Sequence, residues 1–302
     1  MELWFTEEHT KDVRFSIRVE KQIHSEQSRY QRIDVFESDE FGRFLTLDGQ
    51  IMLTEKDEFI YHEMIVHVPM AVNPGIKNVL VIGGGDGGTI RELTRYHSIA
   101  RIDLAELDEH VMEVSRRYFP RISQNLSDPR VSFYFEDGLK FIRDKEKEYD
   151  LILVDSTDPS GPGEGLFTKE FYGSCCNALK ENGILVNQQE CAYYTDYSKF
   201  MKRAYQRMRE IFPVCRIYQA QIPSYPSGNW VFGFASKGLD PVADLQAAKW
   251  KALGLKTRYY NTDVHAGSFA IPNYIRDMLP TQPESANLKN GCPASCGTPV
   301  VY

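Results

Sequence analysis

Short apolar segments alternate with longer amphipathic segments through most of this chain, and this order predicts an α/β fold. In the longer segments apolar residues recur at three- and four-residue spacing, which is typical of helices, whereas the short apolar runs have the length of buried strands. The predicted strands are 78–82, 102–107, 131–135, 150–154 and 183–188, and the predicted helices are 89–96, 109–119, 138–145, 169–179 and 197–212. Such alternation favours a parallel sheet with helices on both faces. Two later β segments, 214–219 and 229–235, are expected to complete the sheet as an antiparallel pair.

The first sixty residues follow a different pattern, in which short β-rich segments partly alternate between apolar and polar side chains. These segments are 14–20, 29–37 and 43–47. Asp48-Gly49 tolerates the positive φ values of a tight primed turn and therefore predicts a hairpin. The pattern becomes helical over 57–67, and Pro69 is expected to end that helix. We therefore expect a small antiparallel β domain over residues 1–60.

Composition and charge narrow the classes of function. Among the 302 residues, 42 acidic side chains outnumber 35 Lys and Arg, which gives a formal net charge of −7. Because no stripe of basic and aromatic residues is present, nucleic-acid binding is not expected. The chain has neither an apolar run of transmembrane length nor a secretory signal pattern, so we expect a cytoplasmic protein without membrane contact. Residues 281–302 are rich in Pro, Gly, Ser and Asn and predict a flexible tail, which leaves 61–280 for the α/β domain.

The six cysteines indicate neither a disulfide framework nor a metal centre. Most lie singly in apolar segments, and we expect reduced thiols. Cys292 and Cys296 are close enough in sequence to form a redox or metal pair, but two ligands without a neighbouring His are too few for a typical zinc site. A loose surface tail is the favoured interpretation, and no metal is expected.

A glycine-rich loop follows the first predicted strand and carries an aspartate in its middle. Gly83-Gly84-Gly85-Asp86-Gly87-Gly88 has the position of a phosphate-binding loop at the start of a nucleotide-binding α/β domain. Such a loop directs backbone N–H groups and a helix N-terminus at an anion. Asp86 adds a negative charge, which repels a carboxylate or pyrophosphate and attracts an ammonium. The loop therefore favours an adenosine-type ligand whose other end is cationic.

Acidic residues also follow the next three predicted strands, at the edge where open α/β sheets bind ligands. They are Glu106, Asp137, Asp155 and Asp158. Glu106 lies about 20 residues beyond the glycines, at the position from which an acid typically binds ribose hydroxyls. The loop 160–167 is expected to close over this site as a lid, the alternative being a passive connection. Taken in order, these acids predict a binding site.

Four of these acids also have a structural interpretation, and for Glu106 it is a solvated side chain. Asp86 is suited to capping a helix, but Gly87 and Gly88 open the loop further and make a good helix start there unfavourable. Asp137 is as well suited to an N-cap as to an adenine contact. Asp158 precedes a proline, as a turn residue does.

A series of motifs, taken in order, points to one family. They are the glycine run 83–88, Asp155-Ser156-Thr157-Asp158-Pro159, Tyr225-Pro226-Ser227-Gly228, the stretch from Leu47-Asp48-Gly49 to Tyr61-His62-Glu63, and Tyr259-Tyr260-Asn261. Together they resemble the spermidine synthase (polyamine aminopropyltransferase) family over residues 1–280. The resemblance implies a methyltransferase-like, Rossmann-type sheet preceded by a small N-terminal antiparallel β domain, in a homodimer or homotetramer. It also implies transfer of an aminopropyl group from decarboxylated S-adenosylmethionine, a co-substrate, to putrescine. The products are spermidine and methylthioadenosine, and no cofactor is expected.

The resemblance also implies roles for individual residues. The nucleoside would contact Gln31, Glu106, Asp137, Gly138 and Pro162, whereas the amine and aminopropyl groups would face His62, Asp86, Asp155 and Asp158, with Tyr61 and Tyr225 shaping the slot. Asp155 corresponds to the family's proton acceptor, and Glu190 is a further candidate for the distal amine. Met52 departs from the glutamine that many members carry near this pocket.

Carboxylates suit this reaction because a protonated amine has no lone pair with which to attack carbon. Three other classes remain open from the sequence. A diamine N-methyltransferase on the same scaffold would keep these acids, and a dinucleotide-dependent oxidoreductase would bring a pyrophosphate against Asp86. A non-catalytic polyamine-binding protein would have no need of Asp155 beside a lid. The preferred amine depends on the length of the pocket.

Overall fold

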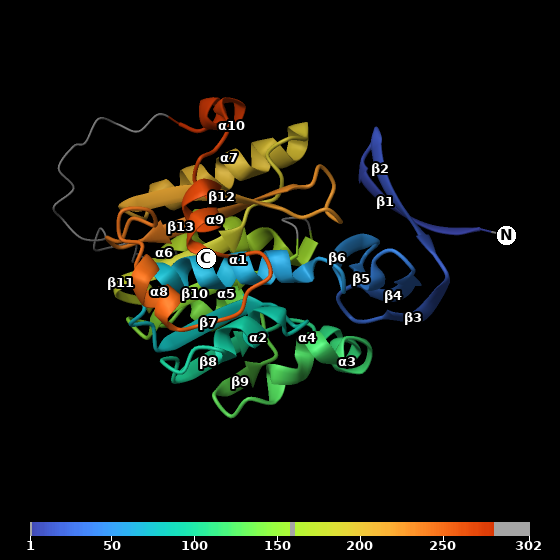
Figure 1. Ribbon diagram of the computed structural model, residues 1–302, viewed down its shortest axis with the longest axis horizontal. Coiled ribbons are helices and arrows are strands. Elements are labelled where there is room, and N and C mark those ends of the chain that lie inside the picture. Colours follow the sequence, from blue (N-terminus) through green and yellow to red (C-terminus); the bar gives the residue numbers. More distant parts are fainter. Residues whose placement is uncertain (1, 158–160, 281–302) are drawn as a thin grey trace, which may run out of the picture.

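The computed structural model describes residues 2–157 and 161–280, and its central element is a mixed sheet (Figure 1). Within these residues the sheet has seven strands in the order β12-β13-β11-β10-β7-β8-β9. The strands are β7 (Asn78–Gly83), β8 (Arg101–Ala105), β9 (Val131–Tyr134), β10 (Tyr149–Asp155), β11 (Leu179–Gln188), β12 (Val214–Gln221) and β13 (Asn229–Ser236). Strands β7 to β11 pair in parallel, whereas β13 runs antiparallel to both of its neighbours. The predicted Rossmann-type α/β sheet is confirmed, including its antiparallel pair at one edge.

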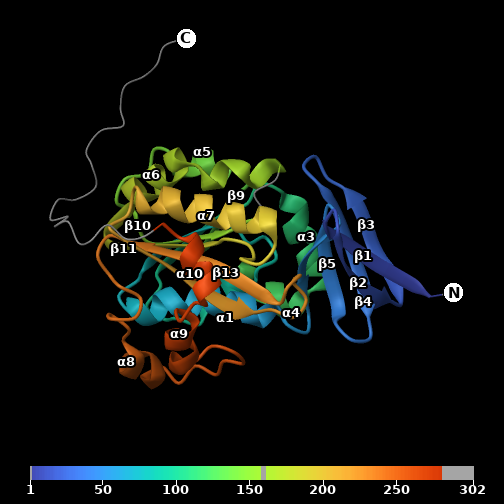
Figure 2. The same ribbon diagram turned by 90° about the horizontal axis from the view of Figure 1, so that it is seen from above.

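Helices cover both faces of this sheet, as predicted (Figure 2). On one face lie α5 (Gly138–Ile142), α6 (Lys169–Ala178) and α7 (Thr195–Arg209), and on the other α1 (Glu58–Val72), α8 (Ala247–Ala252) and α9 (Thr262–Ser268). The remaining helices are α2 (Gly88–Thr94), α3 (Glu109–Tyr118), α4 (Pro120–Ser123) and α10 (Asn273–Met278), with short 3-10 turns η1 (Gln124–Ser127) and η2 (Gly161–Phe167). Alternate side chains of each strand point to opposite faces of the sheet and pack against the helices there. Val81 packs in the core with α1, and Leu80 packs in the core with α6 and α7.

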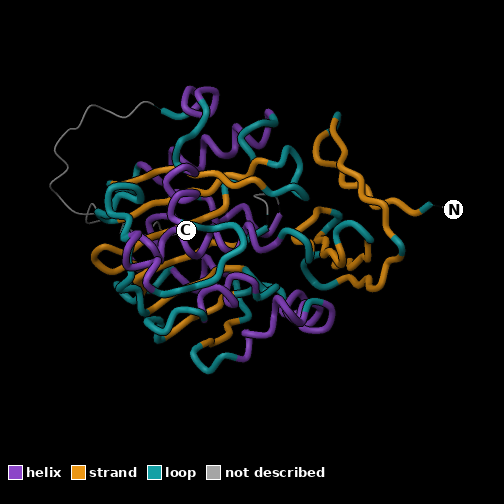
Figure 3. The backbone as a smooth tube through the Cα atoms, in the orientation of Figure 1, coloured by secondary structure: helices purple, strands orange, loops and turns teal. Residues whose placement is uncertain are grey.

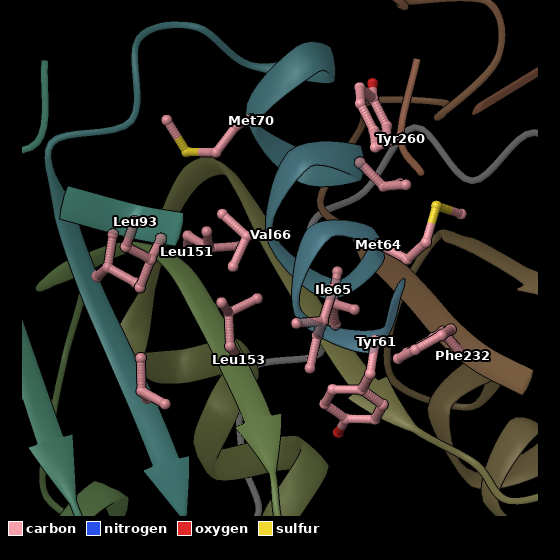
Figure 4. Close-up of a cluster of buried hydrophobic side chains, with 14 of the residues drawn as sticks. Tyr61, Met64, Ile65, Val66, Met70, Leu93, Leu151, Leu153, Phe232 and Tyr260 are labelled. Atoms are coloured by element: carbon pink, nitrogen blue, oxygen red, sulfur yellow. The ribbon is translucent and has the colours of Figure 1, made fainter. Parts of the chain in front are cut away.

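The helix α1 is buried along almost its whole length. Its side chains, Val66 among them, pack against Leu151 and Leu153 of β10 (Figure 4). The prediction that Pro69 ends this helix is wrong, because Pro69 lies inside it and the last turn continues beyond. Packing of the fully buried turn outweighs the single hydrogen bond that a proline cannot donate.

The N-terminal strands lie to one side of the α/β body (Figure 3). They form a four-stranded sheet in the order β3-β4-β5-β6 and a separate pair β1-β2. Their bounds are β1 (Leu3–Thr10), β2 (Val13–Val19), β3 (Lys21–Gln27), β4 (Arg32–Ser38), β5 (Gly42–Leu47) and β6 (Gln50–Thr54). The predicted hairpin is confirmed, since Asp48 and Gly49 join β5 to β6 with φ values of 49° and 81°. Ile33 and Leu45 share a core with Val111 of α3, which holds this sheet against the α/β body.

Three further observations bear on the sequence predictions. β11 begins at Leu179 instead of residue 183, because Leu179 already pairs with Tyr149 of β10. Within the described residues Cys175, Cys191 and Cys215 are free and buried, whereas the Cys292 and Cys296 segment lies outside those residues. No helix in residues 2–157 and 161–280 has the length and apolar character needed to span a bilayer.

Candidate active site

The glycine loop turns sharply between β7 and α2. Gly83, Gly84 and Gly87 have φ values of 79°, 73° and 88°, in the left-handed region that side chains other than glycine rarely occupy. The helix begins at Gly88, and the Gly88 N–H donates to Asp86 Oδ1 at 2.7 Å. The expectation that a helix start here is unfavourable is therefore wrong. Left-handed Gly87 lets the chain enter the helix, so Asp86 both accepts from its first turn and lines the site.

Asp155 is placed beside this loop by the sheet. Its Cα pairs with that of Gly83 across the parallel strands β10 and β7. Thr89 Oγ1 donates to Asp155 Oδ2 at 2.6 Å, and the Tyr61 hydroxyl also donates to this carboxylate. Burial and the negative charge of Asp86 raise the pKa of Asp155 and outweigh these hydrogen bonds and the charge of His62. A carboxylate with a raised pKa is suited to accept a proton.

The pKa of Asp86 is shifted downward, opposite to that of Asp155, by His62 of α1. His62 Nδ1 lies 2.5 Å from Glu58 Oε2, and His62 Nε2 lies 3.3 Å from Asp86 Oδ1. Burial alone would lower the pKa of His62, but Asp86 and Glu58 raise it to about 10, so the imidazole is cationic at neutral pH. Burial would likewise raise the pKa of Asp86, but the charge and hydrogen bond of His62 lower it. The two aspartates therefore differ in protonation behaviour, which is the pattern expected of a binding carboxylate beside a base.

Ligand atoms of His62, Asp86 and Asp155 all lie within 4.8 Å of one another, a spacing that also fits a metal ion. Two of the three residues are carboxylates, which attract a cationic group.

Glu106 follows β8 and faces the glycine loop. Its carboxylate accepts from the N–H groups of Gly85 and Asp108, each at 3.0 Å. Burial raises the pKa of Glu106 to about 7. The two backbone hydrogen bonds lower this pKa, whereas the negative charges of Asp108 and Asp155 raise it further. Gln31 Nε2 donates to Asp108 Oδ2 at 3.1 Å, which places Gln31 next to Glu106 at the same end of the site.

Asp137 caps α5 by accepting from the Leu139 N–H at 2.9 Å, so its structural interpretation is confirmed. The adjacent Gly138 packs so tightly on Ile82 that an added Cβ would lie 2.3 Å from Ile82 Cγ2. Both residues also line the cavity described next, so capping does not remove Asp137 from the site.

One cavity brings the predicted residues together. Its lining includes the candidates Gln31, Tyr61, His62, Asp86, Glu106, Asp137, Gly138, Asp155 and Tyr225, and Met52 as well. Apolar walls come from β5 and β6 through Leu45, Leu47 and Ile51, and from Trp230. Tyr225 is held in this lining by its hydroxyl, which donates to the Met52 carbonyl at 2.5 Å.

Other candidates fall outside this arrangement. Asp158 lies outside the described residues, and Pro162 belongs to η2 but its side chain is not among those described. Glu190 lies just beyond the end of β11, is buried and does not line the cavity. Gln188, the last residue of β11, lines the cavity instead.

Sequence reasoning missed several residues of the site, among them Thr89, Asp108 and Gln188. Thr89 is the second residue of the helix that follows the glycine loop, and this position was a usable signal. The ion-pair partners Glu58 and Arg91 were also missed. Glu58 lies one turn before His62 on α1, whereas Arg91 reaches Glu58 only through the fold.

Comparisons with known proteins agree with this geometry. Residues 58–246 match the spermine/spermidine synthase domain, and residues 3–55 match the spermidine synthase tetramerisation domain. A polyamine aminopropyltransferase of Alkaliphilus oremlandii (strain OhILAs) is 65% identical over 284 residues, which cover 94% of this chain and 100% of that protein. One from Clostridium perfringens (strain 13 / Type A) is 66% identical over 280 residues, with coverage of 92% and 98%.

Solved structures show the same similarity. A spermidine synthase in complex with the transition-state analogue AdoDATO superimposes with a TM-score of 0.89 at 42% identity, over 92% of this chain and 94% of that one. The spermidine synthase from Thermotoga maritima gives a TM-score of 0.86 at 41% identity with the same coverage. This chain therefore belongs to the spermine/spermidine synthase family of aminopropyltransferases.

Proposed function

We propose that this enzyme transfers the aminopropyl group of decarboxylated S-adenosylmethionine to putrescine, giving spermidine and methylthioadenosine, with Asp155 as the proton acceptor. The observation that carries the proposal is the pairing of an ionised Asp86 with a higher-pKa Asp155 at adjacent strand ends, in one cavity. One carboxylate then holds a cationic group while the other takes up a proton.

The donor would lie with its nucleoside near Glu106 and its aminopropyl ammonium near Asp86. We assign the nucleoside contacts to Gln31, Glu106, Asp137, Gly138 and Pro162. Ordinary S-adenosylmethionine carries a carboxylate on the same carbon as its amine, and this group would meet the negative charge of Asp86. Removal of that carboxylate leaves an ammonium alone, which an ionised Asp86 attracts. Asp86 therefore selects the decarboxylated donor.

The acceptor amine must lose a proton before it can attack. An alkyl amine with a pKa near 10.4 is almost fully protonated at pH 7, and deprotonating it costs roughly 4.6 kcal/mol. Asp155 accepts this proton, and the neutral nitrogen then forms the carbon–nitrogen bond as the carbon–sulfur bond breaks. The electrons of the broken carbon–sulfur bond neutralise the sulfonium. The amine thus becomes a secondary ammonium by way of a neutral nucleophile, and methylthioadenosine leaves as a neutral thioether.

Alignment of the amine with the breaking bond is the second requirement of a displacement. We assign it to His62, Tyr61 and Tyr225, together with Asp158, which lies outside the described residues. Tyr61 and Tyr225 form an aromatic contact with ring centroids 6.4 Å apart, and both line the cavity beside Asp155. Aromatic walls of this kind suit the four-carbon chain of a diamine while leaving its ammonium groups to the carboxylates. The predicted closure of loop 160–167 would exclude water from this space.

Self-association belongs to the same proposal. The segment 3–55 matches a tetramerisation domain, and the exposed apolar side chains Leu3 and Trp4 lie in β1. We propose that the N-terminal strands join the subunits of a homodimer or homotetramer, which light scattering on the purified chain would measure.

A product analysis tests the function. Purified enzyme is incubated with putrescine, cadaverine, agmatine or spermidine and either decarboxylated or ordinary S-adenosylmethionine, and products are weighed by mass spectrometry. We expect spermidine and methylthioadenosine from putrescine with the decarboxylated donor. Methylated diamine from ordinary S-adenosylmethionine would instead assign the N-methyltransferase function. Absence of any transferred group with all amines would refute the proposed function.

A further inference from the structure

We propose that Glu58 and Arg91 form a positioning pair that fixes His62 as the cationic partner of Asp86 and so reserves Asp155 as the proton acceptor. This inference rests on the proposed function, since it explains how two neighbouring carboxylates take different roles. Among the described residues, neither Glu58 nor Arg91 lines the cavity assigned to the substrates. They act through His62.

A continuous series of charged contacts runs from Arg91 to Asp86, with hydrogen bonds as far as His62 and an ion pair from His62 to Asp86. Arg91 donates two hydrogen bonds to the Glu58 carboxylate, from Nη1 to Oε1 at 2.8 Å and from Nη2 to Oε2 at 2.9 Å. The same Glu58 Oε2 lies 2.5 Å from His62 Nδ1, and His62 Nε2 lies 3.3 Å from Asp86 Oδ1. Planar, bidentate pairing of this kind fixes orientation as well as charge. The carboxylate of Glu58 is therefore held in one direction, toward the imidazole.

The imidazole is also confined sterically. Glu58 and His62 are one turn apart on α1, and the ring lies against the first turn of α2. A Cβ added to Gly88 would lie 2.2 Å from His62 Cε1, so the ring occupies the space where a side chain at position 88 would begin. The side chains of Glu58 and His62 are only 6% and 3% exposed. Little freedom remains for a different hydrogen-bond arrangement.

The charge of His62 decides between the two aspartates. Two buried carboxylates in proximity do not ionise independently, and the one beside a cation ionises first. Three acids face His62: Glu58 from its own helix, Asp86 from the glycine loop and Asp155 from β10. The ring of Tyr61 contacts the His62 ring edge-on. Arg91 of α2 acts on His62 through its ion pair with Glu58. Because Asp86 is the nearer of the two aspartates, the cation keeps Asp86 ionised, and the proton released by the amine goes to Asp155.

Arg91 and Glu58 also line a second cavity, which is separate from the one that His62 lines. Arg95, directly after α2, lines the same cavity. It shares the partner Glu92 with Arg91, but it donates to the Lys256 carbonyl where Arg91 donates to Glu58. Arg95 is therefore a matched control for Arg91. The second cavity also gives a small cation access to the place of a truncated Arg91 side chain.

The test is the pH profile of kcat/KM for Glu58→Gln. Without Glu58, His62 loses its proton at a lower pH. Once the imidazole is neutral, Asp86 and Asp155 lose their nearest cation and together hold a proton more tightly. The acid limb is the low-pH side of this profile, where kcat/KM rises as the proton acceptor becomes ionised. We expect its midpoint to move to a higher pH by about 1 unit. The imidazole titration of His62, followed by NMR, should move down. An acid limb that stays in place or moves down, with unchanged His62 titration, would overturn the proposal.

Arg91→Met provides a second test that does not depend on the stability of Glu58→Gln. We expect its acid limb to move up as well and to return toward the wild-type position when methylguanidinium is added. Tetramethylammonium at the same ionic strength should not restore it, and Arg95→Met should leave the limb unchanged. Equal responses of the Arg91 and Arg95 variants would contradict a specific role for Arg91. If the wild-type enzyme transfers no aminopropyl group, the proposed function fails. If it does transfer the group, but the acid limbs of the Glu58→Gln and Arg91→Met variants coincide with that of the wild type, only this inference fails.

Discussion

Asp155 pairs directly with Gly83 in the parallel register of β10 and β7. From β7 the chain proceeds to β8 on one side of the sheet, whereas β10 lies on the other side, so this pair marks the point where strand order reverses. Ligands in open α/β sheets bind at such a point. The register therefore places a carboxylate of the later strand against the glycine loop of the earlier one, and it brings Asp86 and Asp155 into one cavity.

Loss of the Asp155 carboxylate should affect turnover far more than donor binding. We expect Asp155→Asn to lower kcat by about 10²–10⁴-fold, because general-base catalysis contributes on that scale. Binding of methylthioadenosine, measured by calorimetry, should change little. A comparable loss of both quantities would show that Asp155 acts mainly in binding.

Asp86 should control which donor is used. In Asp86→Asn the repulsion of a donor carboxylate is removed and the attraction of the donor ammonium is weakened. We expect the ratio of kcat/KM for decarboxylated over ordinary S-adenosylmethionine to fall by about tenfold or more, since hydrogen bonds to charged groups are worth about 1.5–3 kcal/mol. An unchanged ratio would remove Asp86 from donor selection.

Gly88 is required by the position of His62. A Cβ at residue 88 would lie 2.2 Å from the His62 ring, so Gly88→Ala should displace the imidazole and cost about 1–3 kcal/mol of stability. We expect a lower melting temperature and a lower kcat/KM. Gly173→Ala on α6 is the matched control, because an added Cβ there meets no described atom within 4 Å. The two variants behaving alike would contradict the steric argument.

Glu106 should make the ligand-free enzyme less stable at alkaline pH. Its pKa is about 7 in the folded protein and 4.5 for an ordinary glutamate, so the folded state holds this proton more tightly. The resulting loss of stability is absent below pH 4.5, grows as the pH rises toward 7 and is then constant. We expect Glu106→Gln to raise the melting temperature, relative to wild type, by more at pH 8 than at pH 5. Each kcal/mol corresponds to about 2–4 °C for a protein of this size. An identical difference at both pH values would contradict the raised pKa.

Much of this site was predictable because ligand-binding residues in parallel sheets follow strand ends. Hydrophobic periodicity located the strands, and their ends carried Asp86, Glu106 and Asp155 together. Asp137 was left between two roles by its sequence, and the structure gives it a cap without removing it from the cavity.

The failures have physical causes. Proline is unfavourable inside a helix on average, but the burial of almost all of α1 outweighs that preference at Pro69. The role of Arg91 depends on an ion pair with Glu58, 33 residues away, which no local pattern encodes. The spacing of Glu58 and His62 was the only local trace of that network.

A structure of the enzyme with putrescine and methylthioadenosine bound tests the central claim most directly. The account predicts one putrescine nitrogen within hydrogen-bonding distance of Asp155 and directed at the thioether sulfur, with the nucleoside beside Glu106. A diamine bound elsewhere, with the carboxylates of Asp86 and Asp155 directed into bulk solvent, would contradict it.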